Sequence, residues 1–152
     1  MSSPSPRGAK VPSLIGQIAD DLRRHEGTVL HAYPDHLGYW TIGVGRMIDE
    51  RRGGGISEAE AEHLLANDID RIAARLQHEA GFRNSPSEVK RALVNMAYQM
   101  GIKGLLSFQR MWRALEQHDY ETAATEALDS IWAARQTPTR AHEVAGWIRS
   151  AA

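Results

Sequence analysis

The stretch from His25 to Arg46 decides the fold, and it reads HEGTVLHAYPDHLGYWTIGVGR. Glu26 lies where a helical pattern ends, Asp35 follows in a segment rich in turn formers, and Thr41 comes shortly after it. One carboxylate at a helix end and another in a turn occupy different environments, which is the arrangement that general acid–base chemistry uses. The stretch therefore marks Glu26 and Asp35 as candidate catalytic residues.

Upstream of this stretch, the sequence predicts a helix. Leu14, Ile18 and Leu22 recur every four residues and form one apolar face. Gly27 suits the position after a helix C-terminus, so the helix should end near Glu26. Glu26 would then project from a last helical turn, which is a rigid support.

Residues 29–48 predict short strands. Residues that favour strands alternate there with turn signals at Pro34-Asp35 and Leu37-Gly38. Beyond the strands, residues 51–55 carry two arginines and three glycines, which predicts a flexible loop with a local basic patch.

A long helix is predicted after this loop. Ser57 and Glu60 form a capping box, which marks its N-terminus. We expect the helix to run to Ala80 and Gly81 to end it, a length that could join two lobes.

The remaining chain predicts a helical bundle. A second capping box over residues 85–88, with proline at the first helical position, opens a helix that Gly101 stops. Further helices are expected over 108–115, over 119–131 and from residue 137 onward. The predicted fold class is α+β and mostly α, with a small β-hairpin or sheet lobe and a helical lobe.

Length and composition set limits on the fold and on the class of partner. The chain of 152 residues fits one domain, which we place at residues 13–152 after a mobile N-terminal arm over residues 1–12. A net charge of −1 argues against a nucleic-acid binder. Without cysteine, disulfides, a thiolate nucleophile and a Cys-ligated metal are excluded. The polar arm carries no apolar signal-peptide segment, and no run of 18 apolar residues predicts a membrane span.

The motif resembles that of the phage-type lysozymes, or endolysins, of glycoside hydrolase family twenty-four. In that family a Glu, an Asp and a Thr at this spacing are catalytic, and a Thr-Ile-Gly-x-Gly run follows, as at residues 41–45. The resemblance resumes at residues 95–101 and 136–141, and it covers roughly residues 14–150. It implies a lysozyme-like two-lobed fold and an N-acetylmuramidase that cleaves the β-1,4 bond between N-acetylmuramic acid and N-acetylglucosamine in bacterial peptidoglycan.

The resemblance also implies roles for the three residues. Glu26 would be the general acid, while Asp35 and Thr41 would hold the attacking water, giving inversion at the anomeric carbon. Inversion requires the two carboxyl groups to be roughly 6.5–9.5 Å apart. Simpler interpretations remain open, because Asp commonly caps turns and Thr favours strands.

Substrate binding is expected at Tyr98 and Gln99, whose positions face the cleft in the family, and at Gly45 and Met47. Ordinary helix surface is the alternative for Tyr98 and Gln99. For Gly45, close approach of the strand to another backbone is an alternative to contact with the glycan.

Three supporting ion pairs are predicted. Arg140, in the first turn of the last helix, should pair with Glu26, because the family position does so. His25 should pair with Glu143, which shares a helix face with Arg140. Arg46 stands where the family usually has His, and a carboxylate on the long helix, Asp68, is its expected partner.

No cofactor and no metal are expected, because the seven His residues show no ligand spacing. We expect a monomer without membrane insertion. A phage or prophage endolysin would stay in the bacterial host cytoplasm until a holin gives it access to the periplasm and cell wall. The alternatives are a non-catalytic wall-binding or virion structural module on the same fold, and killing by membrane-active helices.

Overall fold

The computed structural model describes residues 13–48, 55–130, 133–134 and 138–152. The chain divides into two compact units, one ending at Glu60 and one running from Ala61 to Ala152, and each is described by itself. The predicted arm over residues 1–12 and residues 51–54 of the predicted loop lie outside the described residues. So do Ile131 and Thr137, at the ends of two predicted helices.

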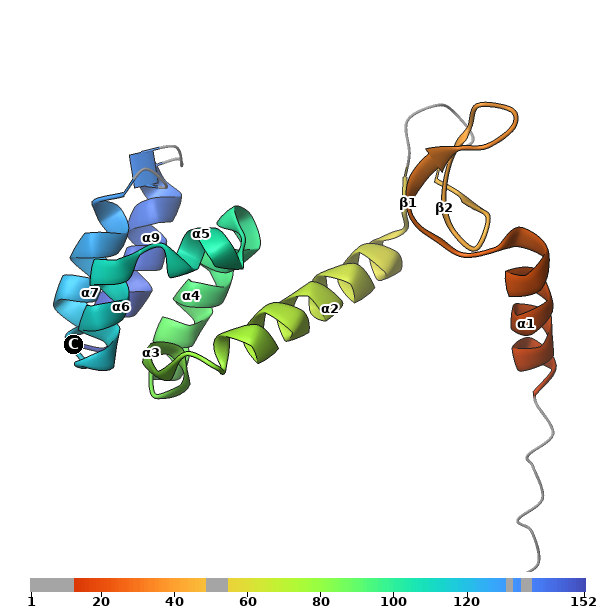
Figure 1. Cartoon of the computed structure of the whole chain (residues 1–152). Helices are drawn as coiled ribbons and strands as arrows, with labels where there is room; N and C mark the ends of the chain where they lie inside the picture. The colour runs from red at the N-terminus through yellow and green to blue at the C-terminus, as the bar shows by residue number, and fades with distance from the viewer. Residues whose placement is uncertain (1–12, 49–54, 131–132, 135–137) are drawn as a thin grey trace, which may run out of the picture. The chain divides into compact units, whose positions relative to one another are not determined.

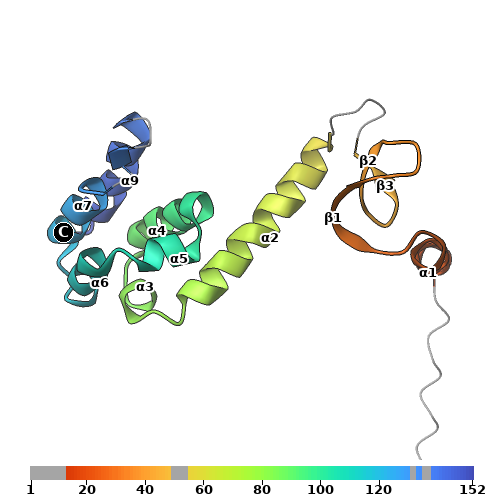
Figure 2. The same ribbon diagram turned by 45° about the horizontal axis from the view of Figure 1, so that its top comes forward.

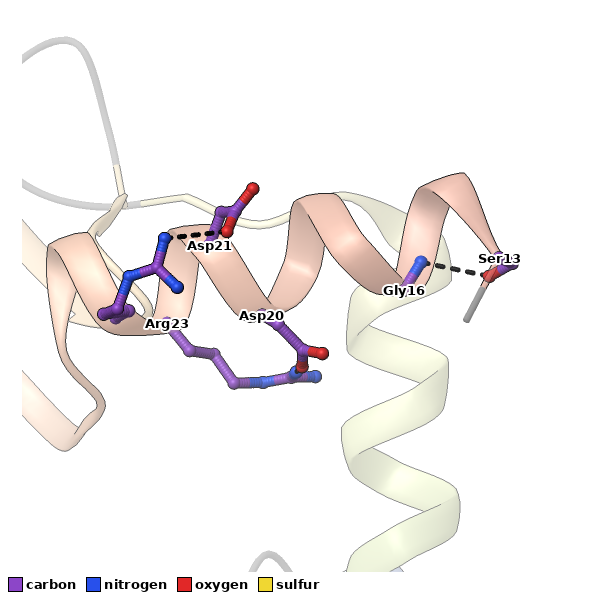
Figure 3. Close-up of polar contacts among 6 residues, drawn as sticks. Ser13, Gly16, Asp20, Asp21 and Arg23 are labelled. Carbon is purple, nitrogen blue, oxygen red and sulfur yellow. Dashed lines mark hydrogen bonds and ion pairs between the residues drawn. The ribbon is translucent and has the colours of Figure 1, made fainter. Parts of the chain in front are cut away.

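The first unit begins with α1, Leu14–Glu26, as predicted. Ser13 caps it, since its hydroxyl accepts a hydrogen bond from the Gly16 N–H at 3.0 Å (Figure 3). At the other end Gly27 has φ +71°, which favours glycine, and its N–H reaches the Arg23 carbonyl at 3.0 Å. No residue of α1 is buried, and ion pairs such as Arg23–Asp20 lie on its surface (Figure 3).

A three-stranded antiparallel sheet follows, with the strands in sequence order (Figure 2). Its strands are β1, Val29–Pro34, β2, Trp40–Gly43, and β3, Arg46–Met47. Tyr33 lies opposite Thr41 in the first pair, and Thr41 lies opposite Met47 in the second. The prediction of short strands over residues 29–48 is confirmed.

The predicted capping box opens α2, Glu58–Leu76. The Ser57 N–H donates to Glu60 Oε1 at 3.1 Å, and the Glu60 N–H donates to the Ser57 hydroxyl at 3.2 Å. The Ser57 hydroxyl also donates to Glu60 Oε1 at 2.7 Å, so this one carboxylate oxygen accepts hydrogen bonds from both the backbone and the hydroxyl of Ser57.

The predicted C-terminus of this helix was wrong. It ends at Leu76, where tighter turns follow, and Ala80–Arg83 forms a separate short helix, α3. Gly81 does not stop α2; it is buried within α3. A Cβ on Gly81 would stand 3.0 Å from Trp112 Cε3, so this glycine serves close packing against another helix.

The prediction of a second capping box over residues 85–88 was also wrong. The next helix, α4, spans Ser87–Met100 and has no side-chain cap, because the Ser85 hydroxyl donates to the Gly81 carbonyl instead. Its predicted end is confirmed: Gly101 has φ +82°, and its N–H donates to the Ala97 carbonyl at 2.8 Å.

Helices also form the rest of the second unit. They are α5, Ile102–Leu106, α6, Gln109–Glu116, α7, Tyr120–Leu128, and α9, Pro138–Arg149. Of these four helices, α5 has no counterpart in the sequence prediction. Figure 1 shows α7 and α9 side by side, and α9 also contacts α4.

The core of the second unit combines residues from most of these helices. Its fully buried large side chains include Phe82, Leu93, Met96, Leu115 and Ile148. The buried Trp112 indole donates to the Leu105 carbonyl at 2.9 Å, which ties α6 to α5. A mostly helical chain with a small antiparallel sheet confirms the predicted α+β class. Among the described residues, no helix combines the length and the apolar character needed to cross a membrane.

Candidate active site

Glu26 is the last residue of α1, and its exposed side chain lies against the turn between β2 and β3. A Cβ built on Gly45 in that turn would stand 2.7 Å from Glu26 Oε2. The structure therefore brings together two of the predicted site residues, Glu26 and Gly45, within the first unit.

Asp35 occupies the turn between β1 and β2 and organises it. Its Oδ1 accepts the N–H groups of Leu37 at 2.9 Å and of Tyr39 at 2.8 Å. Its own N–H donates to the Tyr39 carbonyl at 2.8 Å. The turn-capping interpretation of Asp35 is thus correct for one oxygen, while these contacts do not use Oδ2, which is the atom that could serve in catalysis.

Thr41 is buried in β2, at 4% exposed surface. Its hydroxyl donates to the Tyr39 carbonyl at 3.1 Å. Because the hydroxyl proton is directed to a carbonyl, the lone pairs of the oxygen can accept a hydrogen bond from water. Met47, opposite Thr41 in the register, is exposed on β3.

Arg46 holds Glu60 and not the predicted Asp68. Its two terminal nitrogens reach the two Glu60 carboxylate oxygens at 2.7 Å and 2.9 Å, while Asp68 pairs with Arg71 at 2.9 Å. Asp68 follows Glu60 by eight residues, about 12 Å along a helix, too far for an Arg fixed at Glu60. The prediction that Arg46 pairs with a carboxylate on the long helix is confirmed, but the prediction that this carboxylate is Asp68 is wrong.

Glu60 therefore serves both the helix N-terminus and Arg46. The hydrogen bonds from the Ser57 hydroxyl and backbone, followed by that from Arg46, hold the pKa of Glu60 below its usual value of 4.5. The sequence predicts Ser57 and Glu60 as a helix cap, but it does not predict the contact of Glu60 with Arg46. The contact with Arg46 depends on how β3 is placed beside the start of α2, which the spacing of the residues does not reveal.

The second unit contains a groove of about 550 Å³, and Tyr98 and Arg140 are among its lining residues. Its apolar wall includes Leu65, Ile69, Ala73, Phe82 and Val94. Arg140 donates to Asn95 Oδ1 at 2.9 Å, a contact between α9 and α4 that the sequence analysis missed. Gln99 follows Tyr98 on α4, and both side chains are exposed.

The predicted pairs Arg140–Glu26 and His25–Glu143 each join residues of different units, and both stay predictions. Within the described residues, no group of three or more His, Asp or Glu side chains could hold a metal ion.

The sequence is similar to one protein family and to several known proteins. The model of the family described as phage lysozyme matches residues 23–147. Probable T4-type lysozyme 1 from Dictyostelium discoideum is 26% identical, over 90% of this chain and 96% of its own length. The pre-baseplate central spike protein Gp5 of Enterobacteria phage T4 is 31% identical over 84% of this chain, which matches 26% of that protein. An endolysin of Acyrthosiphon pisum secondary endosymbiont phage 1 is 26% identical over 69% of this chain and 70% of its own length.

The matched range contains Glu26, Asp35 and Thr41 together with all the helices from α2 to α7. It covers more than half of the chain and includes residues of both units. This chain belongs to the phage lysozyme family.

Proposed function

We propose that this chain is a peptidoglycan hydrolase that cleaves the β-1,4 bond between N-acetylmuramic acid and N-acetylglucosamine. Membership of the phage lysozyme family supports a glycosidase acting on peptidoglycan. The observation that supports the proposal is that Glu26, Asp35 and Thr41 lie in one unit, with Glu26 against the turn at Gly45 and with Asp35 and Thr41 hydrogen-bonded to Tyr39.

In the proposed reaction Glu26 acts as the general acid. It gives its proton to the glycosidic oxygen as the bond from the anomeric carbon to that oxygen breaks. The exposed position of Glu26 at the end of α1 suits this role, because the carboxyl group must reach a polymer that approaches from outside.

Asp35 and Thr41 act on the water. The Asp35 Oδ2 accepts a proton from the water, and the Thr41 oxygen accepts the second water hydrogen as a hydrogen bond. The water oxygen then bonds to the anomeric carbon from the face opposite the leaving group, so the configuration inverts. Both residues are fixed through Tyr39, which keeps the water-holding groups in a constant arrangement.

The proposed biological role is lysis of a bacterial host by a phage or prophage. The relative named endolysin favours this role. In that setting the protein remains in the host cytoplasm until a holin gives it access to the wall.

The test compares wild type with Glu26→Gln on cells stripped of their outer membrane. The matched control is Glu58→Gln, which removes another exposed carboxylate of the same unit. Clearing by wild type and by Glu58→Gln, with loss in a folded Glu26→Gln protein, supports the proposal. Mass spectrometry of the released muropeptides identifies the bond, and products with a cut elsewhere would refute the muramidase assignment.

A non-catalytic virion module is the second candidate function. The match to a pre-baseplate central spike protein favours it, because a chain of this kind forms about a quarter of that larger protein. This alternative predicts binding to purified sacculi without release of muropeptides, by wild type and by Glu26→Gln alike.

A further inference from the structure

We propose that Gly45 positions the Glu26 carboxyl group: the absence of a side chain at residue 45 lets the acid rest against the turn between β2 and β3. The inference rests on the proposed role of Glu26 as general acid. It assigns Gly45 a positioning role toward the protein's own acid, separate from its predicted contact with the glycan.

A side chain at residue 45 would meet three atoms of the Glu26 side chain. A Cβ on Gly45 would stand 2.7 Å from Oε2, 2.9 Å from Cδ and 3.1 Å from Cβ of Glu26. Carbon atoms attract best at about 3.5–4.0 Å, so all three approaches are repulsive. Rotating the carboxyl group away relieves the first two contacts but leaves the approach to the Glu26 Cβ.

The turn has little freedom to retreat from Glu26. Ile42 pairs with Arg46 across it, and the Ile48 N–H donates to the Trp40 carbonyl at 2.8 Å just beyond it. Arg46, the residue after Gly45, is held by both oxygens of Glu60. Because the strand is fixed on both sides of the turn, a methyl group at residue 45 displaces the Glu26 side chain.

The variant Gly43→Ala distinguishes the effect of this contact from the effect of backbone strain. Gly43 and Gly45 have φ values of +68° and +63°, so alanine is strained at both. A Cβ on Gly43, however, meets nothing within 4 Å. Gly43→Ala therefore reproduces the strain of Gly45→Ala without the contact to Glu26.

The experiment compares wild type, Gly43→Ala and Gly45→Ala in the full chain. The first measurement, made without substrate, is the set of NMR NOEs between the α-protons of residue 45 and the side-chain protons of Glu26, assigned with Glu26→Gln. The second is kcat and KM on a soluble peptidoglycan fragment. A displacement of about 1 Å can cost about 10²-fold in rate, so we expect kcat to fall by about that factor in Gly45→Ala.

We expect Gly45→Ala to lose these NOEs and to lower kcat with KM within about threefold of wild type, whereas Gly43→Ala keeps the NOEs. Wild-type NOEs in Gly45→Ala would overturn the proposal. Equal loss of the NOEs in both alanine variants would also overturn it, because backbone strain would then explain the loss. A rise in KM alone would assign Gly45 to glycan binding instead.

Two further controls keep the outcomes distinct. If Gly45→Ala does not fold although Gly43→Ala does, the double variant Gly45→Ala/Glu26→Gly decides, because it also removes the Glu26 Cβ: recovered folding supports the contact, and continued failure overturns it. If Glu26→Gln proves fully active, the proposed catalytic function fails, while the NOEs still report whether Gly45 places the Glu26 side chain.

Discussion

Asp35 and Thr41 are bound to the same residue, Tyr39. The Tyr39 N–H donates to Asp35 Oδ1 at 2.8 Å, and its carbonyl accepts the Asp35 N–H at 2.8 Å and the Thr41 hydroxyl at 3.1 Å. The backbone of Tyr39 thus links the two groups proposed to hold the attacking water. A change at one of them should be transmitted to the other through the backbone of this one residue.

The two oxygens of Asp35 can be tested separately. Asp35→Asn keeps a carbonyl oxygen for the Leu37 and Tyr39 N–H groups but removes the base. We expect a folded protein whose rate is lower by about 10²–10⁴. Asp35→Ala should also lower the unfolding free energy by about 1–3 kcal/mol, because two hydrogen bonds are lost.

Thermal unfolding followed by circular dichroism and clearing of stripped cells measure the two effects. Equal melting temperatures for Asp35→Asn and Asp35→Ala would show that the turn does not depend on Oδ1. Wild-type clearing by Asp35→Asn would remove Asp35 from the mechanism.

Thr41 should act through its hydroxyl group. Thr41→Val keeps the β-branched shape that suits a buried strand position but cannot hold a water, whereas Thr41→Ser keeps the hydroxyl. We expect Thr41→Ser to retain much more activity than Thr41→Val. Thr41→Glu should favour a covalent sugar adduct, because a carboxylate would stand where the water is held.

Proton NMR of the first-formed anomer on a soluble substrate tests the water-holding role. Wild type should release the inverted anomer. A retained anomer from the wild-type protein would contradict the role assigned to both Thr41 and Asp35.

The local sequence rules predicted the elements of the first unit well. Gly27 and the Ser57–Glu60 capping box each act within four residues of themselves, so spacing alone predicts the helix ends that they form. The same reasoning failed at Ser85, because its hydroxyl has a competing acceptor in the buried Gly81 carbonyl. That choice depends on packing, which no local pattern reports.

Contacts between elements were harder to predict. The sequence predicted a carboxylate on the long helix for Arg46, but it did not reveal that Arg46 lies beside Glu60 at the start of that helix, while Asp68 pairs with Arg71. Asn95 as partner of Arg140 was missed, although it lies in a stretch that carries the family resemblance. Gly81 admits the Trp112 ring and does not end the helix, and the sequence cannot distinguish these two uses of glycine.

Glu60 should make stability depend on pH in the acid range. Its folded-state pKa lies below its usual value of 4.5, mainly because of the hydrogen bonds from Ser57. A lowered carboxyl pKa gives a stabilising contribution above the unfolded-state value, and that contribution is lost as pH falls through the folded-state value. Glu60→Gln should therefore weaken the decline of the melting temperature below about pH 4.5.

The control is Glu58→Gln, which changes the neighbouring exposed carboxylate and leaves the Ser57 contacts intact. Melting curves recorded between pH 3 and pH 7 at fixed ionic strength make the comparison. If the melting temperatures of wild type and Glu60→Gln fall equally with pH, the lowered pKa of Glu60 does not contribute to the pH dependence of stability.

Two helical glycines should respond to alanine in opposite directions. At Gly81 a Cβ would meet Trp112 Cε3 at 3.0 Å and Leu115 Cβ at 3.3 Å, so Gly81→Ala should destabilise by about 1–3 kcal/mol through overpacking. At Gly146 in α9 a Cβ meets nothing within 4 Å, so Gly146→Ala should stabilise by about 0.5–1 kcal/mol through helix propensity. Urea unfolding of both variants measures the difference. A stable Gly81→Ala protein would mean that α3 and α6 can separate at low cost, and the close approach of Gly81 to Trp112 would then not be a requirement of the core.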